Sequence, residues 1–174
     1  MSSAKAETLA FGVVAYPEGG DVELLLAEFA AGLKTEGVRV GGLLQRSSME
    51  ANGRPRMELC DIESGESFLI SQNLGAKSSA CCVDPAGVAD ASLLLRRAIA
   101  RRPDLLIINK FSGLEAKGEG LRAEFLEALA SGIPVLTGLA ERHREAFEEM
   151  AGGAQTELEA ALPALKDWWR RAGA

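Results

Sequence analysis

The sequence predicts an α/β protein, a three-layer sandwich in which helices cover both faces of a mostly parallel sheet, with an antiparallel β-hairpin appended. Two observations predict this fold. The first is a set of short, continuously apolar runs, which are typical of strands buried on both faces of a parallel sheet. The second is that amphipathic helical segments alternate with these runs, as in strand–helix–strand units. The apolar runs are Leu9–Tyr16, Val38–Leu44, Leu105–Asn109 and Ile133–Leu139.

The first strand–helix–strand unit lies in the N-terminal quarter of the chain. The strand Leu9–Tyr16 is followed by the turn Pro17–Gly20, and Asp21 is a favourable N-cap for the next helix. Gly37 is expected to end that helix as a C-cap. The strand Val38–Leu44 completes the unit, whose crossover should be right-handed. The apolar positions at helical spacing are Val22, Leu25, Leu26, Phe29 and Leu33.

The middle of the chain predicts a loop, a hairpin and a long helix. Ser47–Pro55 is expected to be a polar loop, and Arg56–Ile62 and Ser67–Ser71 are expected to pair as a β-hairpin around a Gly-containing turn. Asp84 precedes a proline at the first helical position, which is typical of a helix N-terminus. This helix should run to about Arg101, because Pro103 follows it.

After the strand Leu105–Asn109, a loop to Gly120 leads into a helix that Gly132 should end. The helix is predicted to bury one face made of Leu121, Phe125, Leu126 and Leu129. The strand Ile133–Leu139 and a short helix near Glu141–Met150 follow. A last helix is expected to begin at a capping box of Thr156 and Glu159, to be divided by Pro163, and to end at Trp168-Trp169.

Length and composition narrow the class of protein. The 174 residues favour a single α/β domain spanning residues 1–174, with residues 1–7 as a disordered polar tail. No apolar run approaches the roughly 20 residues needed to cross a bilayer, and the N-terminus lacks a signal-peptide core. We therefore expect a cytoplasmic protein without membrane insertion. A net charge of −6 argues against a nucleic-acid partner, whose phosphates require many Lys and Arg contacts.

The three cysteines, Cys60, Cys81 and Cys82, form no recognisable disulfide or zinc pattern. Their number is odd, no CxxC spacing is present, and His143 is the sole histidine. Cys81 precedes the expected helix start, where the helix dipole stabilises a thiolate. It is therefore a candidate soft metal ligand, with simple packing as the alternative. No other metal site and no cofactor is predicted.

The turn after the first strand is where nucleotide-binding α/β proteins hold phosphate. A P-loop has the pattern GxxxxGK[ST], in which Lys contacts the phosphates and Ser or Thr holds Mg²⁺. The segment from Tyr16 to Glu23 has two glycines but no Lys, Ser or Thr. Glu18, Asp21 and Glu23 would also repel an anion if they faced the same crevice. The sequence therefore has at most a degenerate Walker A turn.

The order of elements resembles the P-loop nucleoside-triphosphatases, a family of small bacterial, archaeal and human enzymes. The likeness lies in Gly42–Arg46, Asp61–Glu66, Val83-Asp84 and Asp104–Glu115. It implies a P-loop-NTPase-like fold. That family carries Asp-Glu at the end of the corresponding strand for Mg²⁺ and water, where this chain has Asn109 and Lys110. A non-catalytic role is therefore favoured over hydrolysis.

The chain more closely resembles an uncharacterised bacterial family, related to those NTPases, whose genes often lie beside molybdate-transport genes. The resemblance covers nearly the whole chain and implies a role in molybdenum homeostasis. Its segments are Gly42–Arg46, Ile70–Gly75, Cys81 with Val83–Pro85, and Asn109–Leu121.

Polar side chains at the ends of two predicted strands form a candidate oxyanion site. Parallel strands end at one edge of a sheet, where ligands bind, and side-chain donors with backbone amides suit a tetrahedral oxyanion. The predicted ligand-binding residues are Gln45, Arg46, Gln72, Asn73, Asn109, Lys110, Ser112 and Lys117. Plainer alternatives are a surface lysine for Lys110, a salt bridge to an acid such as Glu18 for Arg46, and ordinary loop solvation for Gln72 and Asn73.

Three functions from different classes remain. The favoured one is a non-catalytic protein that binds a small oxyanion, with molybdate as the leading candidate, on a degenerate nucleotide-binding scaffold. The second is a nucleotide-binding protein or NTPase in which Lys110 and Arg46 replace the missing P-loop lysine. The third is a protein-interaction adaptor that uses Trp168 and Trp169 as an apolar anchor. The sequence leaves open whether the chain forms a homo-oligomer.

Overall fold

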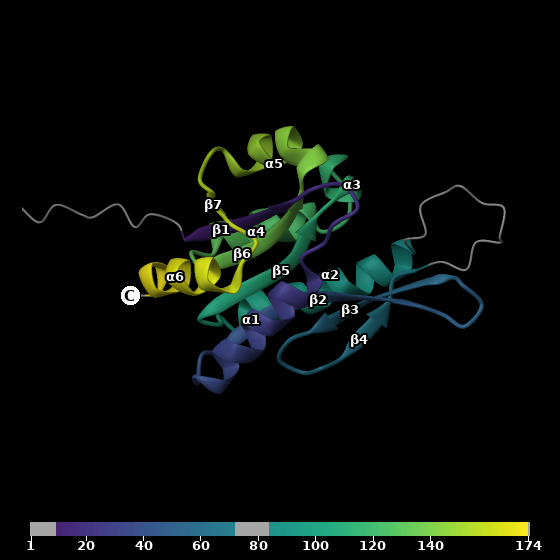
Figure 1. Ribbon diagram of the computed structural model, residues 1–174, viewed down its shortest axis with the longest axis horizontal. Coiled ribbons are helices and arrows are strands. Elements are labelled where there is room, and N and C mark those ends of the chain that lie inside the picture. The colour runs from purple at the N-terminus through teal and green to yellow at the C-terminus, as the bar shows by residue number, and fades with distance from the viewer. Residues whose placement is uncertain (1–9, 72–83, 174) are drawn as a thin grey trace, which may run out of the picture.

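The computed structural model describes residues 10–71 and 84–173, and in this part of the chain it contains one seven-stranded sheet covered by helices (Figure 1). The strand order is β4-β3-β2-β5-β6-β1-β7. The strands are β1 Phe11–Tyr16, β2 Val40–Met49, β3 Pro55–Asp61, β4 Ser67–Leu69, β5 Leu105–Phe111, β6 Val135–Ala140 and β7 Thr156–Leu158. The helices are α1 Glu23–Thr35, α2 Pro85–Ala100, α3 Gly113–Ala116, α4 Arg122–Ala130, η1 Glu141–His143 (a 3₁₀ turn), α5 Arg144–Ala151 and α6 Leu162–Ala172.

The sheet confirms the predicted fold class. β2 pairs with β5, β5 with β6, and β1 with both β6 and β7, and all four pairings are parallel. β3 and β4 extend the β2 edge as an antiparallel hairpin. Most described residues of the apolar runs that predicted these parallel strands are buried, and Leu105–Ile108 of β5 are completely so. This is expected for strands that helices cover on both faces.

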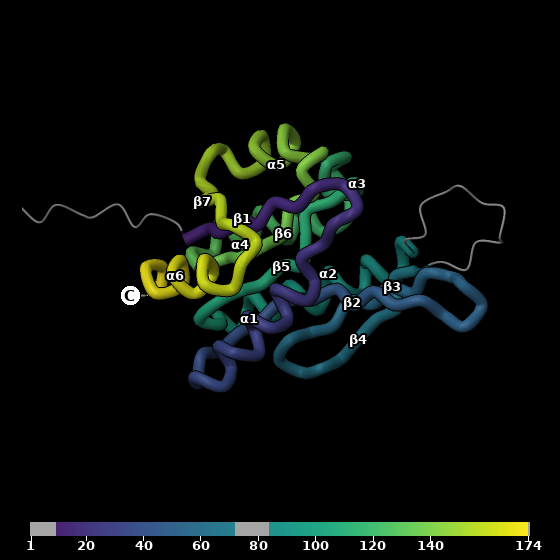
Figure 2. The backbone as a smooth tube through the Cα atoms, in the orientation of Figure 1, coloured from purple at the N-terminus to yellow at the C-terminus, as the bar shows by residue number. Residues whose placement is uncertain are grey.

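Two apolar cores define the three layers. On one face of the sheet, Leu26, Phe29 and Leu33 of α1 pack with Leu165 and Trp168 of α6. The core of the other face is built from α2, α4 and α5, whose largest buried side chains include Leu95, Phe125 and Phe147. In Figure 2 both ends of the described chain lie at the left of the view, where α6 returns to β1 and Trp168 lies against Gly12. Among the described residues, no helix has the length and apolar character that a bilayer crossing requires.

Several predicted helix boundaries are confirmed by their caps. Asp84 accepts a hydrogen bond from Ala86 N at 3.0 Å, with Pro85 in the first turn of α2. Gly37 follows α1 with φ +81°, where a glycine is favoured. The cap of α1 differs slightly from the prediction, because the helix begins at Glu23 and Asp21 accepts a hydrogen bond from the Glu23 amide at 3.2 Å.

The predicted polar loop Ser47–Pro55 is too long. Ser47, Ser48 and Met49 extend β2 and pair with β3, so that β2 has ten residues and the loop is shorter. These residues are exposed, and an antiparallel ribbon in water needs no apolar pattern. The loop after β5 was also incompletely predicted, since residues Gly113–Ala116 form the single-turn helix α3.

The C-terminal region corrects two further predictions. Thr156 does not cap a helix, because Thr156–Leu158 is the edge strand β7, which pairs with Gly12–Val14. Pro163 lies in the first turn of α6 instead of dividing it, a position where proline costs no hydrogen bond.

In α4 the predicted apolar face is wrong at Leu126, which is 47% exposed. Glu124 is buried there instead, and it accepts hydrogen bonds from Ser92 and Arg96.

Candidate functional site

The carboxyl ends of β1, β2, β5 and β6 meet at one edge of the sheet and bring Tyr16, Gln45, Lys110 and Ala140 together. α1 begins beside this edge, because the turn Pro17–Gly20 follows β1 directly. The turn is closed by a hydrogen bond from Gly20 N to Pro17 O at 3.0 Å. Residues far apart in sequence thus form one surface, as expected for a parallel sheet.

Glu23, the first residue of α1, is the carboxylate at the centre of this edge. Its Oε1 accepts hydrogen bonds from Gln45 Nε2 at 2.8 Å and Ser47 Oγ at 2.7 Å. Its Oε2 accepts one from Ser47 N at 3.0 Å. Lys110 Nζ lies 3.8 Å from Glu23 Oε1, and both side chains are largely buried. Three close donors therefore satisfy the carboxylate, and Lys110 adds a longer ion pair.

Asn109 fixes the position of Gln45. Asn109 Oδ1 accepts a hydrogen bond from Gln45 N at 2.9 Å, and Asn109 Nδ2 donates to Gln45 Oε1 at 3.2 Å. Both side chains are buried. The pairing of β5 with β6 shifts register between Ile108 and Lys110, and such a bulge re-aims the following side chain. The structure thus uses Asn109 to hold the strand ends, while Lys110 lies at the accessible edge.

A second buried carboxylate, Glu115, organises the segment after β5. Its Oε2 accepts hydrogen bonds from Ser112 N at 3.1 Å and Ser112 Oγ at 2.9 Å. Its Oε1 accepts one from Leu121 N at 3.1 Å, and Glu115 is 5% exposed. Gly120 has φ +59°, and a Cβ there would lie 2.4 Å from Glu115 Oε1. Ser112 and Glu115 thus form a capping box at the start of α3, and this box fixes Ser112 next to Lys110.

Two pockets open on either side of Lys110. The larger, about 340 Å³, extends from Gln45 and Asn109 to Lys117 and is bordered by α2 and β3. The smaller, about 170 Å³, lies against the turn after β1 and the ends of β1 and β6. Lys110, Ser112 and Arg142 line both pockets. A ligand bound by these three residues would therefore reach both hollows.

The structure brings together most, but not all, of the predicted ligand-binding residues. Gln45, Asn109, Lys110, Ser112 and Lys117 line the larger pocket, with Lys117 on the exposed rim.

Arg46 is not among them. Arg46 is exposed, and the residue opposite it on β3 is Glu58. Its side chain lies on the opposite face of β2 from Gln45, because neighbouring residues of a strand alternate in direction. Gln72, Asn73 and Cys81 lie outside the described residues, as does the predicted tail 1–7.

Cys60, on β3, is only partly buried. Burial raises the pKa of its thiol, Arg46 lowers that pKa in part, and Glu58 raises it. Within the ranges 10–71 and 84–173, no group of three His, Cys, Asp or Glu residues is arranged to hold a metal ion.

Sequence reasoning did not single out Arg142 or Tyr16 as site residues. Arg142 lies in η1, where its guanidinium pairs with Glu18 at 4.0 Å and its Nε donates to His143 Nε2 at 3.1 Å. Burial lowers the pKa of His143, and the positive charge of Arg142 lowers it further. Burial also raises the pKa of Tyr16 to about 12, with Arg142 opposing and Asp21, Glu23 and Glu115 adding to the rise. The charged run Glu141–Arg144 directly follows the last buried strand, and this position in the sequence could have indicated Arg142 as a site residue.

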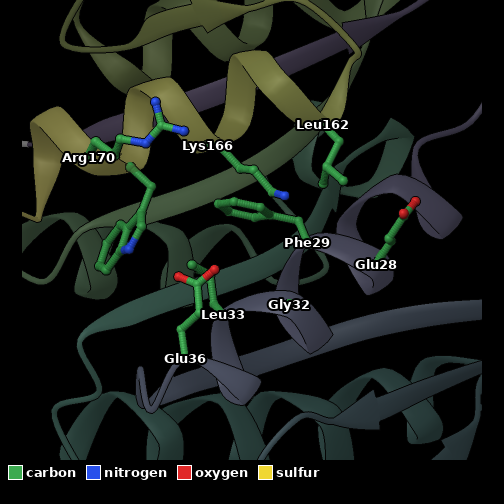
Figure 3. A pocket seen from close by; sticks show the side chains of 9 residues that line it. Glu28, Phe29, Gly32, Leu33, Glu36, Leu162, Lys166 and Arg170 are labelled. Carbon is green, nitrogen blue, oxygen red and sulfur yellow. The ribbon is translucent and has the colours of Figure 1, made fainter.

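A third hollow of about 240 Å³ lies away from this edge, between α1 and α6. Figure 3 shows the Lys166 side chain of α6 extending toward Phe29 of α1, with Leu33 and Glu36 of α1 below. None of its lining residues borders the two edge pockets. It is therefore separate from the candidate site.

The sheet order and the helices on both faces define a three-layer α/β protein whose fold matches that of a solved nucleoside-triphosphatase structure. The structure superposes on the solution structure of a human cancer-related nucleoside triphosphatase with a TM-score of 0.70, covering 93% of this chain and 98% of that one. The identity is 16%, so the likeness concerns the fold alone.

The chain belongs to the family described as "Protein of unknown function (DUF2478)", which residues 11–168 match. It is also 42% identical over 158 residues to the molybdenum import ATP-binding protein ModC 2 of Bradyrhizobium diazoefficiens. That match covers 90% of this chain but spans only 18% of the length of the relative.

Proposed function

We propose that this protein binds a small divalent oxyanion, with molybdate as the leading candidate, and that it does so without catalysis. The observation that carries the proposal is the grouping of Lys110, Ser112 and Arg142 where two pockets meet. Two cations and a hydroxyl at one point are the donors that oxyanions use in proteins. The molybdenum context is carried by the printed name of the 42% identical relative, and it is analogy.

Glu23 is the main opposing feature, because its carboxylate faces the same edge. Its oxygens already accept hydrogen bonds from the Gln45 side chain, the Ser47 amide and the Ser47 hydroxyl. The Lys110 ammonium is 3.8 Å away, too far for a strong hydrogen bond to Glu23, so its protons remain available to a ligand. Glu23 thus holds the ammonium at the edge while other groups satisfy the carboxylate itself.

Isothermal calorimetry on the full chain with molybdate, tungstate, sulfate and phosphate tests this proposal. Binding should weaken as salt is raised, because the contacts are partly exposed ion pairs. Lys110→Ala and Arg142→Ala should each remove about 1–3 kcal/mol of binding free energy, the usual size of a charge-assisted contact. Arg170→Ala is a matched control, since Arg170 lies on α6 and pairs with Asp167. Absence of heat with all four anions would overturn the proposal.

The second candidate is nucleotide binding or hydrolysis. It is favoured by the NTPase-like fold and by the name of the relative, which is an ATP-binding protein. Against it, the turn after β1 carries Glu18 and Asp21 and no lysine, and Asn109-Lys110 ends β5 where an acidic pair would hold Mg²⁺. We expect no Mg²⁺-dependent phosphate release from ATP or GTP. Release above background that Lys110→Ala abolishes would establish the second candidate instead.

A further inference from the structure

The larger edge pocket has two chemically different walls. One wall is apolar and comes from β3, the residue after β4, α2, and the segment around α3. Its side chains are Met57, Leu59, Ile70, Val88, Leu114 and Leu121. Met57 and Val88 are only partly buried and pack against the core below, so the apolar wall faces the pocket as well as the interior.

The other wall is polar and carries an excess of positive charge. Among the described residues that line it, Lys110, Lys117 and Arg142 are cationic and Glu115 is acidic. Glu23 lies 3.8 Å from Lys110 Nζ, and the exposed Glu18 lies 4.0 Å from Arg142. The two largely buried carboxylates, Glu23 and Glu115, offset part of the positive charge, and the three cations leave a small excess for an anion.

An inorganic oxyanion uses only half of such a pocket. A bare, strongly hydrated ion gains nothing from an apolar wall, and moving it closer to that wall costs solvation. The volume of about 340 Å³ falls in the range of about 300–1,000 Å³ that is typical of pockets for organic ligands. The smaller pocket, at about 170 Å³, is below that range.

We propose that this edge also takes an organic anion, with a phosphate or carboxylate at Lys110 and Arg142 and an apolar ring system against Val88 and Met57. This inference rests on the proposed anion site and names the ligand class that it takes. The apolar wall supplies affinity by burying the ring, and the cations fix its orientation. Lys110 and Arg142 serve both the ring-bearing anion and a free oxyanion, so the two ligands compete.

The test compares matched probes on the full chain by calorimetry: inorganic phosphate, phenyl phosphate and 1-naphthyl phosphate. Affinity should rise at least tenfold from phosphate to naphthyl phosphate, with a negative heat-capacity change on binding that grows with ring size. Molybdate should displace naphthyl phosphate, and Lys110→Ala should weaken all three phosphate probes.

A pocket-filling variant separates the ring from the charge. Val88→Phe narrows the apolar side of the pocket, so it should lower the affinity for naphthyl phosphate much more than the affinity for inorganic phosphate. Leu93→Phe is its control on the same helix, because Leu93 is 53% exposed and does not line the pocket. Circular dichroism and urea unfolding confirm that both variants fold.

The outcomes distinguish this inference from the proposed function. Suppose that inorganic oxyanions bind. If the rings then add no affinity, or if the affinity gained from the ring survives Val88→Phe, the organic-ligand inference is wrong and the oxyanion proposal stands. If only the ring-bearing phosphates bind, and Lys110→Ala weakens them, the inference stands and the molybdate proposal falls. If no probe binds, both are wrong.

Discussion

At the scale of single residues, Glu23 determines how much positive charge the edge presents. Replacing it by Gln removes a negative charge 3.8 Å from the Lys110 ammonium, and at partly buried sites such a charge changes interactions by roughly 1–2 kcal/mol. We expect Glu23→Gln to bind oxyanions severalfold more tightly. The same change should lower the free energy of unfolding by about 1–2 kcal/mol, because charge-assisted hydrogen bonds to Gln45 and Ser47 become neutral ones.

Calorimetry and urea unfolding measure these two opposite effects. Glu28→Gln is the control, since it removes the same charge five residues further along α1, at an exposed position. Unchanged or weaker oxyanion binding by Glu23→Gln, with the fold intact, would mean that Lys110 does not contact the anion.

Tyr16 provides a direct spectroscopic test of burial at this edge, because it is the sole tyrosine of the chain. Burial raises its pKa to about 12 from the ordinary value of 10.0. Between these pH values the unfolded chain has lost the phenolic proton while the folded chain keeps it. Stability is therefore unaffected by Tyr16 below pH 10 and falls between pH 10 and 12 by ~1.4 kcal/mol per pH unit.

Ultraviolet titration of the folded protein should show phenolate only near pH 12, and in urea near pH 10. Tyr16→Phe should remove this part of the alkaline loss of stability. A midpoint near 10 in the folded protein would show that the end of β1 is open to water.

At the scale of elements, the sequence was sufficient wherever one apolar pattern determined one element. The buried parallel strands β1, β5 and β6, the first part of β2, and helix α2 were predicted because their residues face helices or carry a local cap such as Asp84. β7 and the end of β2 were missed because their residues, such as Thr156 and Ser47, are held by pairing with distant strands and have no periodic pattern. Arg142 was missed as a site residue for the same reason, because its place in the site depends on how β6 lies beside β5.

Two glycines show how strongly an element can constrain one position. Gly42 of β2 has φ +110°, and a Cβ there would lie 2.0 Å from Ile107 O of the neighbouring strand. Backbone strain and overpacking each cost about 1–3 kcal/mol, so Gly42→Ala should destabilise the protein by about 2–5 kcal/mol. Gly32 lies inside α1, and a Cβ there would have no neighbour within 4 Å, so Gly32→Ala should instead stabilise the protein by roughly 0.5–1 kcal/mol.

Urea unfolding of both variants provides the measurement, and each serves as the control for the other. Equal effects of the two substitutions would mean that β2 and β5 do not approach as closely as the structure has them.

At the scale of the whole molecule, the two tryptophans of α6 connect the last described helix to the core beside β1. Trp168 is 4% exposed, and a Cβ at Gly12 of β1 would lie 2.9 Å from its ring. Trp168 is thus a core residue and does not offer the exposed anchor that an adaptor would need. Trp168→Ala should cost about 3–5 kcal/mol, and Trp169→Ala clearly less, because Trp169 only packs against the edge of this core.

Denaturant unfolding followed by the fluorescence of the remaining tryptophan measures this difference. Equal, small losses for both variants would indicate that α6 is not docked on β1.

The position of β1 also has a consequence for the order in which the protein is made. β1 is synthesised before the other described strands, yet both of its partners are made late: Phe11 pairs with Val135 of β6, and Gly12 pairs with Thr156 of β7. At about 5–20 residues per second, synthesis from β1 to β7 takes roughly 7–28 s. During that time the hydrogen-bonding edges of a strongly apolar strand wait without their partners, and such edges invite pairing with other chains. Production of the folded protein in cells should therefore depend on chaperones that shield β1 until β7 and α6 have been synthesised.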